Sequence, residues 1–107
     1  MTVKGTNLAM TRGDSESITV ICTSDPFVSG DTVTMTLRPE VDEAIALQKV
    51  VTEFNDGAAV IGIAPADTAN LTMDMDYVYD IQVTRANGTV TTLVKPSRFT
   101  IEEEVTY

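Results

Sequence analysis

The sequence of 107 residues contains no histidine, no tryptophan and a single cysteine, Cys22. A lone cysteine cannot form an internal disulfide, so the chain is not a small secreted domain held together by disulfides. The lack of histidine excludes an imidazole metal site, a Ser-His-Asp triad and a Cys-His dyad. Basic residues are also scarce, because 7 Lys and Arg stand against 16 Asp and Glu, for a net charge of −9. Nucleic-acid binding requires a basic face, so this charge argues against a nucleic-acid partner.

Long hydrophobic runs are missing as well. The longest are only a few residues, such as residues 58–63, whereas a transmembrane helix needs about 20. The first seven residues lack the apolar stretch of a secretory signal. We therefore expect a chain that is made in the cytoplasm and has no membrane partner. Its length predicts one domain over residues 1–107.

Residues branched at Cβ dominate what is present. Threonine (17), valine (13) and isoleucine (7) make up 37 of the 107 residues. These side chains fit a pleated sheet better than a helix. The composition therefore predicts an all-β protein.

Hydrophobic alternation marks eight candidate strands. The clearest is Thr32 to Arg38, where Val33, Met35 and Leu37 alternate with threonines. The pattern is poorest in residues 45–54, where Lys49 shares a face with apolar residues, as is typical of an edge strand or a bulge. The predicted strands cover residues 8–11, 16–23, 32–38, 45–54, 58–64, 77–85, 89–95 and 98–103.

Turn signals separate these strands. Pro65 predicts one short helical turn within residues 65–71, because proline is favoured at the first helical position. Asn55-Asp56-Gly57 predicts a tight turn, and Asn87-Gly88 predicts a two-residue hairpin with positive φ at both residues. Pro96 is expected to separate the last two strands. Seven to eight short strands with these turns predict a single antiparallel two-sheet sandwich of immunoglobulin-like architecture.

Several motifs occur in an order that resembles a known family. They are Thr11-Arg12-Gly13-Asp14, the segment 29–37, the segment 63–71 with Pro65-Ala66-Asp67-Thr68, the segment 77–83 (Tyr-Val-Tyr-Asp-Ile-Gln-Val), the segment 88–93 and the segment 99–102. Together they resemble small immunoglobulin-like proteins of bacteriophages and prophages of Gram-positive bacteria, and the N-terminal domain of the phage baseplate upper protein. The resemblance covers nearly the whole chain. It departs at Asp74-Met75-Asp76, where the family usually has a glycine shortly before the first tyrosine.

The resemblance implies a structural role in a phage particle. We expect a non-enzymatic tail, baseplate or head accessory component, made in the bacterial cytoplasm and then built into the virion. Its partners would be other phage structural proteins or further copies of itself, and it would need no cofactor. Strand edges in residues 45–54 and 98–105 are the predicted contact elements, because a free edge offers unpaired backbone groups. Two alternatives stay open, a carbohydrate-binding module for host attachment and a prophage-encoded regulatory binding protein.

Individual residues give no catalytic, cofactor or metal assignment. Arg12-Gly13-Asp14 spells an adhesion tripeptide, but we interpret it as a turn between two strands. Cys22 shares a face with Ile18 and Val20, which predicts a small buried side chain and not a reactive thiol. With 16 acidic residues, the pairs of carboxylates that glycoside hydrolysis requires are expected by chance.

Two sets of side chains are candidates for a binding site. Asp74, Asp76 and Asp80 surround two tyrosines, and either a cation site or a solvated strand face explains them. A sugar platform would need exposed aromatic rings, for which the chain offers Tyr77, Tyr79 and Tyr107. We expect the first two to be buried.

Overall fold

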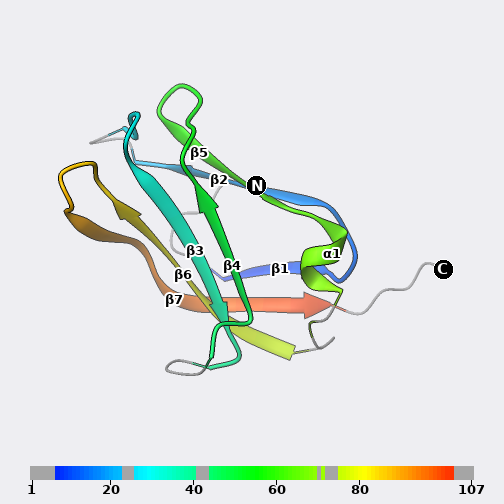
Figure 1. The fold of residues 1–107 in the computed structure, drawn as a ribbon. Helices are drawn as coiled ribbons and strands as arrows, with labels where there is room; N and C mark the ends of the chain where they lie inside the picture. The colour runs from blue at the N-terminus through cyan, green and yellow to red at the C-terminus, as the bar shows by residue number, and fades with distance from the viewer. Residues whose placement is uncertain (1–6, 23–25, 41–43, 70, 72–74, 103–107) are drawn as a thin grey trace.

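The computed structural model describes residues 7–22, 26–40, 44–69, 71 and 75–102, with only the backbone described for Met75. Within these residues, seven strands and one helical turn follow each other along the chain (Figure 1). They are β1 (Leu8–Thr11), β2 (Glu16–Ile21), β3 (Thr32–Arg38), β4 (Leu47–Val51), β5 (Ala58–Ile63), α1 (Pro65–Thr68), β6 (Met75–Thr84) and β7 (Val90–Glu102). The prediction of an all-β protein is confirmed.

The strands form two sheets. One has the order β1-β7-β6-β3-β4 and the other consists of β2 and β5. All pairs are antiparallel except β1 with β7, which run parallel from Leu8 opposite Phe99 to Thr11 opposite Glu102. The prediction of purely antiparallel sheets is therefore wrong. Parallel neighbours need a long crossover connection, and here the six elements between β1 and β7 supply it.

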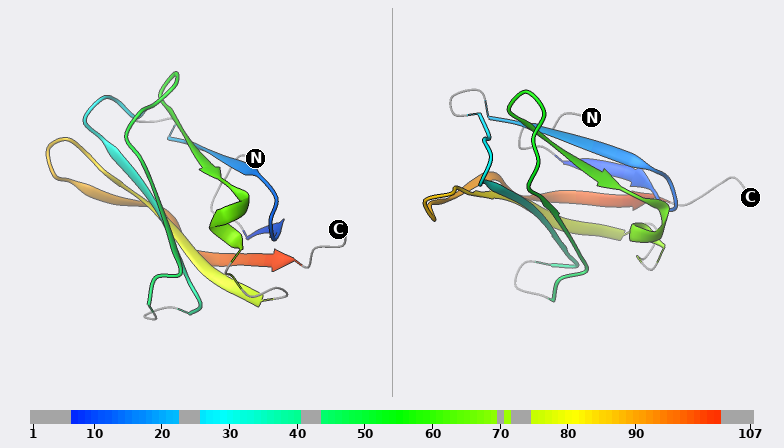
Figure 2. Two further views of the ribbon diagram at one scale, coloured as in Figure 1. Left: turned by 45° about the vertical axis from the view of Figure 1, so that its right-hand side comes forward. Right: turned by 45° about the horizontal axis from the view of Figure 1, so that its top comes forward.

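The core lies between the two sheets, which Figure 2 shows as separate layers. Alternation along each strand turns one face inward, and the inward side chains of β2, β3, β5 and β6 are nearly all buried. Tyr79 of β6 and Phe99 of β7 meet edge to face, with ring centroids 5.7 Å apart. Fully buried members of this core include Ile18, Val33, Met35, Ile61, Ile81, Val83 and Ile101.

The predicted helical turn is present as α1, at the end of the domain where β1 and β7 finish (Figure 1). Pro65 opens it, and the Asp67 carboxylate accepts a hydrogen bond from the Ala64 N–H at 2.8 Å. Buried Thr68 accepts a hydrogen bond from the Gly13 N–H at 2.9 Å, which ties α1 to the turn between β1 and β2. Within the described residues, no helix is long and apolar enough to cross a membrane.

The tight turns after β4 and after β6 differ in length. Between β4 and β5, Asp56 (φ 53°) and Gly57 (φ 77°) form a two-residue turn closed by hydrogen bonds between Asn55 and Ala58, as predicted. Between β6 and β7 the Gly88 N–H donates to the Arg85 carbonyl and the Arg85 N–H donates to the Thr89 carbonyl. This loop has three residues with positive φ only at Gly88, so the predicted two-residue turn is wrong.

Strand β7 runs through Pro96 without interruption, so the predicted break between residues 89–95 and 98–103 is wrong. The register against β6 shifts twice, because Tyr79 lies opposite Ser97, Ile81 opposite Val94 and Gln82 opposite Thr92. These shifts place extra β7 residues at bulges, where proline is tolerated because a bulge leaves a residue outside the regular ladder. Predicted strands 16–23 and 45–54 are shorter than expected and end at Ile21 and Val51.

Candidate functional site

Strand β4 is an open edge of the five-stranded sheet. Among the described residues it pairs only with β3, from Val33 opposite Val51 to Leu37 opposite Leu47. The side chain of Val50 points outward and is 57% exposed, and Ile45 just before the strand is also exposed. The prediction that residues 45–54 contain an edge strand is confirmed. An open edge of this kind presents unpaired backbone N–H and C=O groups to another chain.

The second predicted edge, residues 98–105, is not an edge over its described part. Phe99 to Glu102 pair with β1 on one side, and Phe99 and Ile101 also pair with β6 on the other. The reason is the short strand β1, which pairs with the last four residues of β7. The alternation of apolar residues along β7 does not reveal that another strand pairs with it. Residues 103–105 lie outside the described residues. Among the residues that the structure describes, the first half of β7, from Val90 to Val94, pairs only with β6.

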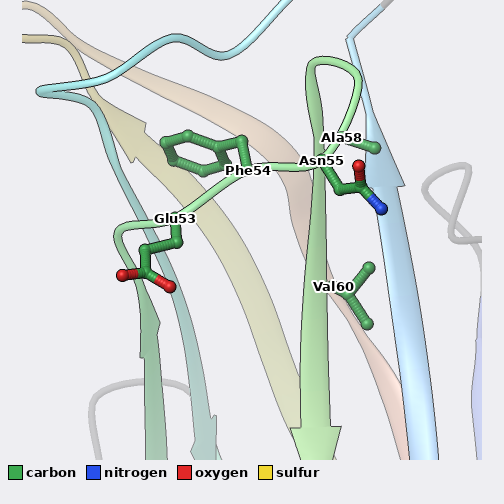
Figure 3. Close-up of a pocket in the computed structure, with 5 residues that line it drawn as sticks. All are labelled: Glu53, Phe54, Asn55, Ala58 and Val60. Carbon is green, nitrogen blue, oxygen red and sulfur yellow. The ribbon is translucent and has the colours of Figure 1, made fainter.

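Two shallow hollows adjoin at the turn that joins β4 to β5. One, of about 280 Å³, is lined by Glu53, Phe54, Asn55, Ala58 and Val60 (Figure 3). The other, of about 290 Å³, is lined by Phe27, Val28, Ser29, Thr52, Gly57 and the same Glu53 and Phe54. Because the two hollows share the last two residues, we treat them together as the Phe54 hollow. It lies just beyond the end of β4, where the chain passes from the five-stranded sheet to the two-stranded sheet.

Residues 27–29, in the loop between β2 and β3, form one wall of the Phe54 hollow. The rings of Phe27 and Phe54 are tilted at 36° with centroids 5.3 Å apart. The Phe27 N–H donates to the Gly57 carbonyl at 3.2 Å. A Cβ at Gly57 would lie 2.7 Å from the Cβ of Pro26, so the close approach of this loop to the hairpin requires glycine. These contacts fix the position of Phe54.

A buried ion pair holds the same loop to the hairpin between β6 and β7. The Asp31 side chain, 2% exposed, accepts hydrogen bonds from the Val28 N–H at 3.0 Å, the Ala86 N–H at 3.2 Å and the Arg85 guanidinium at 2.8 Å. The Arg85 guanidinium also lies over the Phe27 ring, 5.4 Å from its centroid. The hydrogen bond from Val28 is the main cause that lowers the pKa of Asp31, and Arg85 and Ala86 lower it further.

Sequence reasoning placed Asp31 in a loop and missed this arrangement. Its partner Arg85 is 54 residues away, and no local pattern connects the two. A second ion pair joins the core-facing side of β4 to α1, with Lys49 Nζ 3.0 Å from Asp67 Oδ2. The Ala64 N–H and then Lys49 lower the pKa of Asp67. This pair also explains the charged residue that the alternation of β4 placed on an inward face.

The structure describes two of the three aspartates in the predicted acidic cluster, Asp76 and Asp80. Asp76 is exposed, accepts a hydrogen bond from Thr100 at 2.6 Å and lies 3.3 Å from the Arg98 guanidinium. Asp80 lies on the same outward face of β6, and Asp74 lies outside the described residues. Within the part of the chain that the structure describes, no three His, Cys, Asp or Glu side chains are grouped to hold a metal ion.

The other predicted residues that the structure describes pack in or against the core, or form a turn. Tyr77 and Tyr79 are 4% and 1% exposed, as expected, and burial raises the pKa of Tyr79; Tyr107 lies outside the described residues. Cys22 is half-buried and packs against the core. Gly13 has a φ of 87° between β1 and β2, which confirms a turn at Arg12-Gly13-Asp14.

Comparison of the sequence with models of protein families and with curated protein sequences finds no match. The open edge of β4 and the Phe54 hollow are therefore defined as a candidate site by their geometry alone.

Proposed function

We propose that this chain is an immunoglobulin-like interaction domain of a bacteriophage particle, which binds neighbouring structural proteins of the tail or baseplate. The strand layout supports the architecture. In variable-type immunoglobulin domains, strands G, F, C and C′ lie in one sheet, and B and E lie in the other. Here β7, β6, β3 and β4 lie in one sheet and β2 and β5 in the other, in the matching chain order. The paired cysteines and core tryptophan of antibody domains are absent from the sequence.

The observation that carries the proposed function is the open edge of β4. An extended segment of a partner can add to such an edge, with backbone hydrogen bonds supplying affinity and side-chain contacts supplying specificity. Val50 and Ile45 would contribute apolar surface to that contact. The net charge of −9 keeps free copies of the chain apart and attracts a partner that carries basic residues.

The carbohydrate-binding alternative predicted from the tyrosines receives no support from the two that the structure describes. Sugar rings stack on exposed aromatic side chains, whereas Tyr77 and Tyr79 are buried in the core. We therefore do not propose it, and the regulatory alternative becomes an outcome of the test below.

The test is quantitative mass spectrometry of purified phage particles from the bacterium that encodes the chain. We expect a fixed number of copies per particle, in the tens if the chain belongs to the baseplate. If the chain is abundant in the lysate but missing from purified particles, the proposed function is wrong. Co-purification with one host protein in its place would indicate the regulatory role.

A further inference from the structure

The Phe54 hollow combines an aromatic ring, a carboxylate and aliphatic walls. Phe54 is half-buried, Glu53 is exposed, and both residues line the hollow. Val60 and Val28, which are 47% and 60% exposed, contribute apolar surface on either side. Within the described residues, Glu53 forms no ion pair. The carboxylate is therefore available to a cation from outside the domain.

The adjoining loop shows which side chain suits such a set of groups. There, the Arg85 guanidinium lies over the ring of Phe27 and donates to the carboxylate of Asp31. Phe54 and Glu53 offer the same two components, a ring and a carboxylate, to the solvent. Arg85 should repel a second cation only weakly, because the carboxylate of Asp31 lies 2.8 Å from its guanidinium and offsets its charge.

We propose that the Phe54 hollow receives an arginine side chain of the partner protein. This inference rests on the proposed function, because it identifies the chemistry of the partner that meets the edge of β4. A guanidinium is planar and can stack on the ring of Phe54 while it donates to the carboxylate of Glu53, which an ammonium does less well. The net charge of −9 draws the same cation toward the domain.

The place of the hollow agrees with this role. Figure 3 shows it where the chain leaves β4 and enters β5, directly beyond the end of the open edge. A partner segment that pairs along β4 and extends past Val51 would come next to the residues that line the hollow. The arginine would then anchor one end of that segment.

The test is an NMR titration of the full, ¹⁵N-labelled chain with the peptide Ac-Ala-Arg-Ala-NH2. The control peptide replaces arginine by citrulline, which has nearly the same shape and no charge. We expect saturable shifts confined to amides around Phe54 with the arginine peptide, and weaker binding of the citrulline peptide. Glu53→Gln should weaken binding by roughly three- to fivefold, within the range of exposed ion pairs. Phe54→Leu should weaken it to a similar degree because it removes the ring.

The matched control is Asp56→Asn, which removes the same charge three residues further along the chain. The side chain of Asp56 does not line the hollow. Binding by this variant should equal that of the wild type. Equal shifts with both peptides, or an equal loss in Glu53→Gln and Asp56→Asn, would overturn the inference. If the chain is present in particles but the arginine peptide does not bind, the inference fails while the proposed function stands.

Discussion

Asp31 and Arg85 are 54 residues apart in the chain, and their side chains meet at 2.8 Å. The pair joins the loop before β3 to the hairpin after β6, and residues 27–29 of that loop line the Phe54 hollow. Because the guanidinium also covers the ring of Phe27, the ion pair and the aromatic contact between Phe27 and Phe54 form one connected structure. The shape of the candidate site therefore depends on a contact outside it.

Asp31→Asn should lower the free energy of unfolding, because it removes the charge of a buried carboxylate that accepts hydrogen bonds from the Arg85 guanidinium and from two backbone N–H groups. The comparison is Asp76→Asn, which removes the exposed pair with Arg98 and should change the free energy of unfolding by less than about 1 kcal/mol. Urea denaturation of both variants measures the difference. Equal midpoints would contradict the role assigned to Asp31.

The stability of the domain should fall in acid. The pKa values of Asp31 and Asp67 lie below 3.8 in the folded state, so folding favours their charged forms. This stabilisation is fully present above the unfolded-state value and is lost as the pH drops through the lowered folded-state values. Denaturation midpoints of the wild type and Asp31→Asn should therefore differ at about pH 6 and converge well below pH 3.8. A gap that stays constant with pH would contradict this explanation.

Phe99→Ala should destabilise the domain by about 3–5 kcal/mol, because it opens a cavity in the core beside Tyr79. The control is Val90→Ala in the same strand, where the side chain is 56% exposed and the change should stay within about 0.5 kcal/mol. Chemical denaturation compares the two. Similar losses in both variants would show that Phe99 does not lie in the core.

Gly57→Ala should cost about 1–2 kcal/mol or more, because a Cβ at a φ of 77° is strained and would also meet Pro26. Gly62→Ala is the matched control, since a Cβ there meets nothing within 4 Å. That substitution should be neutral or slightly stabilising. Thermal unfolding of the two variants distinguishes the positions. If Gly62→Ala lowered the unfolding temperature more than Gly57→Ala, the description of the turn between β4 and β5 would be wrong.

Local patterns predicted most of the strands. Thr32 to Arg38 alternates cleanly because one face is buried against the other sheet, and its predicted bounds match β3. The Asp56-Gly57 turn was equally predictable from the sequence, since a tight two-residue turn of this kind needs positive φ at both positions. In β4, the inward Lys49 indicated an edge strand before its partner Asp67 was known.

Non-local pairing could not be predicted in the same way. Nothing in the alternation of β1 shows that Leu8 lies parallel to Phe99, because the sequence of a strand does not name its neighbour. Pro96 indicated a break, but the bulges against β6 absorb it. The Phe54 hollow arises where the loop before β3 meets the turn between β4 and β5, so Glu53 and Phe54 were visible only as the end of a strand with poor alternation.

We propose that the chain binds its partner through the open edge of β4. The most direct test counts copies per particle for Val50→Lys and for Gln82→Lys. Val50 lies on the edge strand, whereas Gln82 lies on the same outer face but on β6, which is paired on both sides. Lysine on an edge strand discourages the addition of another strand. We predict severalfold fewer copies of Val50→Lys and wild-type numbers of Gln82→Lys. Wild-type incorporation of Val50→Lys would contradict the account.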